Sequence, residues 1–131
     1  MLNLIKKLGY LPAFGWAIIL AILMLLPQDN FPDSKLLSYD KLAHVGVFAG
    51  LSFLILLGFL IKERKHTRKQ LVITLTISIV YGSFLDYLQT YVPGRMTDLY
   101  DFIANCTGGV VGVIIFSIFT RQKFVINKLK L

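Results

Sequence analysis

The chain has 131 residues, 56% of them hydrophobic, with a formal net charge of +7 and a mean hydropathy of +0.69. A soluble or disordered chain of this length does not carry so much apolar surface, so the composition excludes both and indicates one membrane domain over residues 1–131. The net charge alone could indicate a nucleic-acid partner, but the positions of the basic residues argue against one.

Four apolar segments are long enough to cross a bilayer. A bilayer core needs roughly 20 mostly apolar residues, and lipid offers no hydrogen-bond partner to an exposed backbone, so each segment must be helical. The sequence therefore predicts an all-α membrane protein, a four-transmembrane-helix bundle. In chain order, the predicted spans are 9–26, 42–61, 71–91 and 102–120.

The first span shares one feature with a signal peptide, because Lys6 and Lys7 precede its apolar run. No small-x-small cleavage site follows Leu26, and the run is long enough to cross the membrane. We therefore expect this segment to be a membrane helix.

Lysine and arginine residues gather on one side of the predicted membrane. They lie at the N-terminus, in the loop 62–69 and in the tail after residue 120, whereas the other two loops carry only Lys35, Lys41 and Arg95. By the positive-inside rule, both the N- and C-termini are expected to be cytoplasmic. The basic residues then serve topology and attraction to anionic lipids, and no nucleic-acid partner is expected.

Acidic residues show the opposite distribution. Glu63 is the only one on the predicted cytoplasmic side, and Asp86 falls within the outer end of the third span. A charged side chain at the centre of a membrane helix costs about 2.5–3.5 kcal/mol, so Asp86 is expected to face the protein interior and to have a partner. The remaining acidic residues lie in or beside the outer loops: Asp29, Asp33, Asp40, Asp98 and Asp101.

Helical spacing predicts which polar side chains share a face at the outer ends of the second and third spans. Asp40 and His44 are four residues apart and should share a face, whereas Lys41 is expected to point elsewhere on the turn. On the third span, Asp86 and Gln89 fall on one stripe.

A second stripe leads into the fourth span. Asp98, Asp101 and Asn105 share a face if the helix begins near Thr97, which would then be the N-cap, with Asp98 as a first-turn acid favoured by the helix dipole. Glycines continue this stripe, so Asn105 is expected to face a close neighbouring helix. Two GxxxG patterns occur, Gly46–Gly50 and Gly108–Gly112.

Three helix ends and the Pro93-Gly94-Arg95 turn should therefore present one polar cluster at a single membrane level. On the predicted topology this level is extracytoplasmic. The candidate functional residues are Asp40, Lys41, His44, Asp86, Gln89, Arg95, Asp98, Asp101 and Asn105.

The order of these motifs carries a family resemblance. The chain has Asp-Lys-x-x-His, Asp-x-x-Gln, Pro-Gly-Arg, Asp-x-x-Asp and Asn-x-x-Gly in sequence between Tyr39 and Gly112. In this it resembles the VanZ-like family of bacterial membrane proteins, which is associated with resistance to the glycopeptide antibiotic teicoplanin. The family usually has Glu where this chain has Asp86, a side chain one methylene shorter. The resemblance implies a multi-pass protein of the cell membrane and leaves the biochemical mechanism open.

Three hypotheses account for the cluster. In the first, it recognises an anionic lipid head group, a lipid-linked cell-wall precursor or a glycopeptide: Lys41, His44 and Arg95 hold a phosphate, while the acidic residues and Asn105 orient these cations and contact sugar or peptide groups. In the second, the protein is an intramembrane enzyme acting on a lipid phosphate, with His44 as general acid or base tuned by a neighbouring Asp, and carboxylates that could hold a divalent ion on the substrate.

The third hypothesis is a purely structural ion-pair network centred on Asp86 with Arg95 or Lys41, although buried pairs often fail to offset their desolvation. No catalytic residue can be assigned from the sequence. No cofactor or resident metal is expected, because the cluster has a single histidine and no thiol group. Cys106, the only cysteine, lies about 100° around the helix from Asn105 and is expected to be a packing residue.

Overall fold

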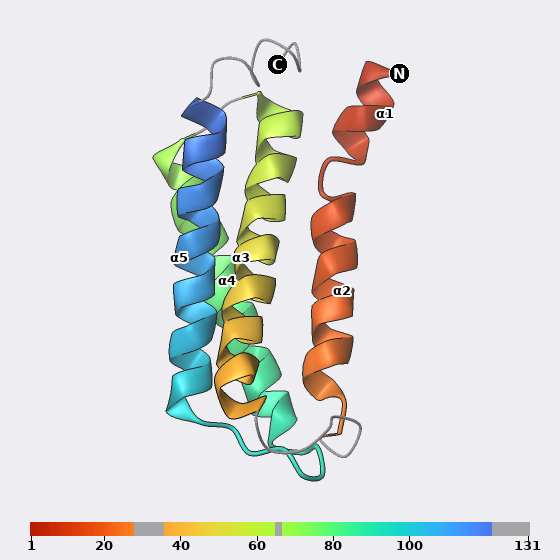
Figure 1. Ribbon diagram of the computed structural model, residues 1–131. Helices are drawn as coiled ribbons and strands as arrows, with labels where there is room; N and C mark the ends of the chain where they lie inside the picture. The colour runs from red at the N-terminus through yellow and green to blue at the C-terminus, as the bar shows by residue number, and fades with distance from the viewer. Residues whose placement is uncertain (28–35, 65–66, 122–131) are drawn as a thin grey trace.

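Five helices make up most of the described chain in this computed structural model (Figure 1). The structure describes residues 1–27, 36–64 and 67–121, and for residues 2 and 36–40 it describes the backbone alone. No β-strand occurs within these residues. The helices are α1 (Leu2–Lys7), α2 (Leu11–Leu25), α3 (Leu36–Glu63), α4 (Arg68–Gln89) and α5 (Leu99–Arg121).

Four of the described segments are long and apolar enough to span a membrane, by length and composition. This confirms the predicted all-α bundle and makes the chain a multi-pass membrane protein. The helical elements extend beyond several of the predicted spans, and α3 in particular begins at Leu36. The spanning segments are Asn3–Leu25, Lys41–Glu63, Arg68–Gln89 and Leu99–Arg121.

A turn interrupts the first spanning segment between α1 and α2, a feature that the hydropathy pattern did not predict. The turn lies against the end of α3, where the Tyr10 ring occupies the space a Cβ on Gly58 would need and packs edge-on against Phe59 at 5.5 Å between ring centroids. Pro12 then lies in the first turn of α2, where its missing N–H costs nothing.

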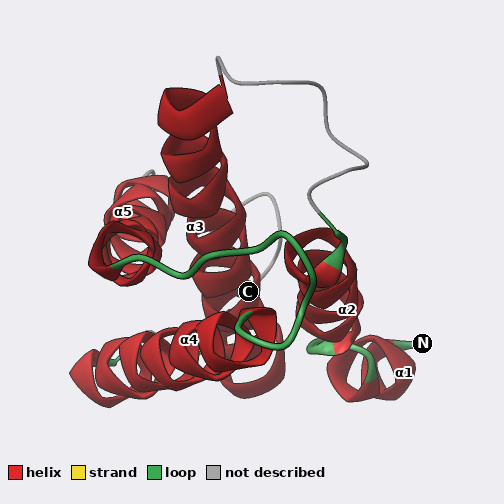
Figure 2. Cartoon of the chain, turned by 90° about the horizontal axis from the view of Figure 1, so that it is seen from below, coloured by secondary structure: helices red, strands yellow, loops and turns green. Residues whose placement is uncertain are grey.

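Successive long helices alternate in direction, so α3 and α5 run the same way and α2 and α4 run the opposite way (Figure 1). Seen from the end, α3 lies between α5 and α2, and α4 crosses beside them (Figure 2). The most extensive contact is between α3 and α5. The helix end where α3 and α5 begin is therefore also the end where α2 and α4 finish.

Glycines on α5 allow this close contact with α3. A Cβ on Gly108 would lie 2.5 Å from the Val45 carbonyl oxygen, and one on Gly112 would overlap the Ala49 carbonyl oxygen. The Gly46–Gly50 pattern does not act this way: Gly46 faces open space, and Gly50 faces the Trp16 ring, not a helix backbone. Only the second GxxxG pattern therefore brings two backbones together within the described chain.

Hydrogen bonds from side chains to the backbone fix α2 against its neighbours. The Trp16 indole N–H donates to the Val47 carbonyl at 2.8 Å, and the Tyr81 hydroxyl donates to the Ala17 carbonyl at 2.6 Å. In lipid, such bonds between helices supply association energy that apolar contact alone does not.

Most of the described basic residues, apart from Lys41 and Arg95, lie at the opposite end of the bundle from the candidate cluster. The N-terminus and the last residue of α5 lie at one end, and the starts of α3 and α5 lie at the other (Figure 1). Lys6 and Lys7 on α1, Lys62 on α3 and Arg121 on α5 belong to the first end. The expected separation of charge is thus present, while the cytoplasmic assignment of that end stays a prediction.

We predict that Gly112→Ala lowers stability by about 1–3 kcal/mol, because the new methyl group forces α3 and α5 apart. Gly46→Ala is the matched control, since its methyl group enters open space and should leave stability unchanged or slightly raised. Thermal unfolding midpoints of both variants in detergent micelles provide the comparison. Equal midpoints would contradict the close contact at Gly112.

Candidate functional site

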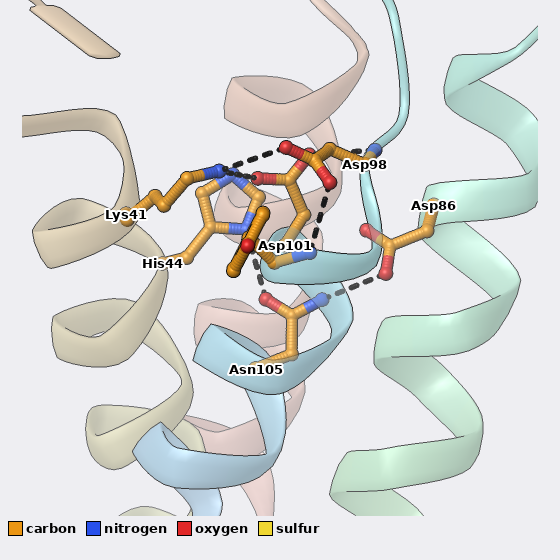
Figure 3. A network of polar contacts seen from close by, with 7 residues as sticks. Lys41, His44, Asp86, Asp98, Asp101 and Asn105 are labelled. Carbon is orange, nitrogen blue, oxygen red and sulfur yellow. Dashed lines mark hydrogen bonds and ion pairs between the residues drawn. The ribbon is translucent and has the colours of Figure 1, made fainter. Parts of the chain in front are cut away.

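A polar network joins α3, α4 and α5 at the end of the bundle where α3 and α5 begin (Figure 3). The Lys41 ammonium donates to Asp101 Oδ1 at 3.0 Å and lies 3.7 Å from Asp98 Oδ2. It also lies 5.6 Å from the centroid of the Tyr100 ring. The Asp101 side chain is 8% exposed and that of Lys41 is 32% exposed. Lys41 therefore joins a buried carboxylate to the surface of the protein.

Below this ion pair, three side chains form a chain of hydrogen bonds (Figure 3). His44 Nδ1 lies 2.8 Å from Asn105 Oδ1, and Asn105 Nδ2 donates to Asp86 Oδ2 at 3.0 Å. A carboxylate only accepts, so the Asn105 amide must turn its N–H₂ toward Asp86 and its oxygen toward His44. His44 Nδ1 is then the donor, which fixes the proton position on that ring nitrogen.

The chain beginning α5 is held by its own acidic residues. The Asp98 N–H donates to Asp101 Oδ2 at 3.2 Å, and Asp98 Oδ1 accepts from the Tyr100 N–H at 3.1 Å. These two hydrogen bonds place Asp98 at the N-cap, with its carboxylate on the N–H of the second helical residue and its own N–H bonded to Asp101. The prediction of Thr97 as N-cap was therefore wrong, because α5 begins at Leu99 and the Asp98 carboxylate accepts the Tyr100 N–H.

Gln89 and Arg95 bind the end of α2. Gln89 Nε2 donates to the Met24 carbonyl at 2.8 Å, and Arg95 Nε donates to the Leu26 carbonyl at 3.0 Å. The last carbonyls of a helix have no partner within it, so these donors satisfy them. They also tie the connection between α4 and α5, which crosses the end of the bundle, to α2 (Figure 2).

The structure thus distributes the candidate residues between two groups. In the first group, the Gln89 and Arg95 side chains donate to carbonyls at the end of α2. Asp40 is assigned to neither group, because it lies in the first turns of α3 and its side chain is outside the described residues. The network group consists of Lys41, His44, Asp86, Asp98, Asp101 and Asn105.

One expectation about contacts, and one pairing that belonged to the structural hypothesis, were wrong. Lys41 does not point away from the His44 face, because residues three apart on a helix are neighbours and both reach α5. Among the described residues, the side chain bonded to Asp86 is the neutral Asn105, not Arg95 or Lys41. Sequence spacing identifies the face of a helix but does not say which neighbouring helix that face meets.

A groove with a volume of about 400 Å³ opens between α4 and the start of α5, beside the network. Several of its residues were not predicted, although Ser83, Asp86, Tyr87 and Thr90 follow one helical stripe that spacing could have identified. The Lys41, His44 and Arg95 side chains do not line it. The lining residues are Ser83, Asp86, Tyr87, Thr90, Thr97, Asp98, Leu99 and Phe102.

One oxygen of the network has no partner. Asp86 Oδ1 is buried and makes no hydrogen bond within the described chain. At the edge of the groove, the Tyr87 and Tyr91 hydroxyls lie 2.7 Å apart. This hydrogen bond raises the pKa of the exposed Tyr91 phenol, which stays protonated near neutral pH. The groove therefore combines acceptor oxygens with hydroxyl groups.

Residues 13–120 match a family model described as VanZ/LLP1. The matched range contains the whole network and the groove. No curated protein and no solved structure matches the chain significantly.

We predict that Asn105→Leu destabilises the bundle, because it removes the bonded partner of both His44 Nδ1 and Asp86 Oδ2. A buried polar group that loses its partner costs about 1–3 kcal/mol. The control is Thr107→Ala on the exposed face of α5, where the change should stay within about 0.5 kcal/mol. Unfolding measured in detergent tests this, and similar stabilities for the two variants would show that the hydrogen-bond chain contributes little.

Proposed function

The chain belongs to the VanZ/LLP1 family, and from this premise we propose that it recognises the polar head group of a membrane lipid or of a lipid-linked cell-wall precursor. The observation that carries the proposal is the polar network beside an open groove at one end of the bundle. Polar groups at this depth are costly, and in membrane proteins they commonly mark functional sites.

Exposure within the network supports recognition over a purely structural role. The Lys41 and Asp98 side chains are 32% and 49% exposed, so this ion pair is partly open to a ligand. An exposed pair contributes little to stability. A network that served only to join the helices would not need a groove beside it.

Lys41 is the cation best placed to meet a phosphate beside the groove. It contacts Asp98, which lines the groove, and both of its carboxylate partners lie on α5. Under this proposal, a head-group phosphate approaches Lys41 from the exposed side while the carboxylates keep the ammonium in position. Arg95, which donates to the end of α2, would contact the same head group from the α4–α5 connection.

An intramembrane enzyme acting on a lipid phosphate is the second candidate. The hydrogen-bond chain from Asp86 through Asn105 to His44 favours it, because it orients the imidazole as a catalytic acid or base requires. The burial of His44, which is 5% exposed and does not line the groove, favours recognition instead. Head-group recognition is thus our conclusion.

Under this proposal the site faces the extracytoplasmic surface, because most of the described basic residues lie at the opposite end of the bundle. A role in the cell envelope, and in tolerance of glycopeptides such as teicoplanin, is part of the proposal through the family resemblance.

The topology has a direct test. A reporter fused after Arg121 should be active only in its cytoplasmic form, and a reporter inserted between α2 and α3 should be active only in its extracytoplasmic form. The reverse pattern would place the cluster in the cytoplasm and would exclude an outer-leaflet ligand.

The recognition proposal predicts that the protein purified in mild detergent carries one polar lipid class above its abundance in the membrane. Lys41→Gln should lower this enrichment about tenfold, because a charge-assisted contact to phosphate is lost. Lys69→Gln, at the opposite end of the bundle, should leave the enrichment unchanged. Lipid mass spectrometry measures the enrichment, and thermal unfolding checks that both variants fold. The absence of any enriched polar lipid would count against recognition.

A further inference from the structure

The groove between α4 and α5 differs in charge from a phosphate-binding cleft. Two carboxylates, Asp86 and Asp98, lie along it, and no lysine, arginine or histidine of the described chain lines it. The other polar residues of its lining carry hydroxyl groups: Ser83, Tyr87, Thr90 and Thr97. A phosphate would meet two like charges there, whereas a cation would meet two opposite ones.

Asp86 also has an unused acceptor. Asp86 Oδ2 accepts from Asn105, which is neutral, while Oδ1 is buried and has no partner in the described chain. The nearby cation Lys41 is already shared between Asp98 and Asp101. A buried carboxylate oxygen without a donor is costly, and Asp86 lines the groove, so its carboxylate retains an acceptor for a donor that enters there.

The surroundings of the groove indicate a lipid as the source of that donor. Asp86 lies one turn from the end of α4, beside the paired phenols of Tyr87 and Tyr91, and aromatic residues of this kind commonly mark the membrane interface. Toward the membrane centre, the same helix carries an exposed apolar strip with a second shallow groove of about 420 Å³. Its lining residues are Thr76, Ile77, Val80, Tyr81 and Phe84.

We propose that the α4–α5 groove binds the ammonium group of an amine-bearing membrane lipid, which donates hydrogen bonds to Asp86 and Asp98 while an acyl chain lies along the exposed strip of α4. This assignment rests on the proposed head-group recognition and names the chemical class of its ligand. The phosphate of the same zwitterionic head group then lies toward Lys41, which contacts Asp98 from the other side.

The test uses the full-length protein in detergent, loaded with defined lipids and examined by native mass spectrometry. Phosphatidylethanolamine should be retained about tenfold more strongly than phosphatidylglycerol with the same acyl chains, because only the former carries an ammonium group. Asp86→Asn should abolish this preference. It keeps the side-chain shape and an acceptor for Asn105, so the fold is retained.

Ser83→Leu provides a second variant that leaves the hydrogen-bond network untouched but fills the groove, and it should reduce phosphatidylethanolamine retention by a similar factor. Glu63→Gln is the matched control, since it removes a carboxylate at the opposite end of the bundle and should change nothing. Free ethanolamine should compete poorly at the same concentration, because it lacks the acyl chain.

If the two lipids are retained equally and Ser83→Leu lowers the retention of both, the ammonium assignment is wrong. Head-group recognition would still stand in that case. Retention of both lipids that neither groove variant affects would overturn the groove as the site and, with it, the proposed function. Competition by ethanolamine as strong as that by the lipid would overturn the lipid as the source of the ammonium group.

Discussion

The backbone contact between α3 and α5 is the constraint on which the polar end of this protein depends. Gly108 and Gly112 let α5 approach the Val45 and Ala49 carbonyls of α3. Because α3 and α5 run in the same direction, this contact also fixes which residues of the two helices face each other one turn closer to their N-termini. There the α3 side chains meet the first two turns of α5, where Asp101 and Asn105 lie. A larger residue at either glycine would separate both pairs at once.

In a membrane, this alignment of α3 and α5 decides whether the polar groups between the helices find partners. Lipid cannot hydrate a carboxylate or an amide, so each polar group between the helices needs a partner within the protein or in a bound ligand. Most find one: Asn105 bridges α3 and α4, and Gln89 joins α4 to the final carbonyls of α2. Asp86 Oδ1 is the exception in the network, and it belongs to a residue that lines the groove. The residue with an unpaired oxygen thus lies at the α4–α5 groove.

The spans, the separation of charge and the buried face of Asn105 all followed from the sequence, because hydropathy and helical period fix them locally. The hydrogen-bond partners of these side chains could not be predicted from the sequence. The period places Asp86 and Gln89 on one stripe, yet Asp86 bonds to α5 and Gln89 to α2, since a stripe facing the interior can meet two helices. The structural hypothesis paired Asp86 with Arg95 or Lys41, but Arg95 contacts the carbonyls of α2, whose position depends on how the bundle packs. The α4–α5 groove arises from that packing as well.

Photo-crosslinking in native membranes tests the central claim, that the polar end of the bundle selects a lipid head group. A photoreactive phenylalanine analogue at Phe102 would lie in the groove, and one at Ile114 would lie on the exposed face of the same helix. The account predicts that the probe at Phe102 captures one polar lipid class well above its membrane abundance, while the probe at Ile114 captures lipids in proportion to their abundance. The same lipid mixture at both positions would contradict it.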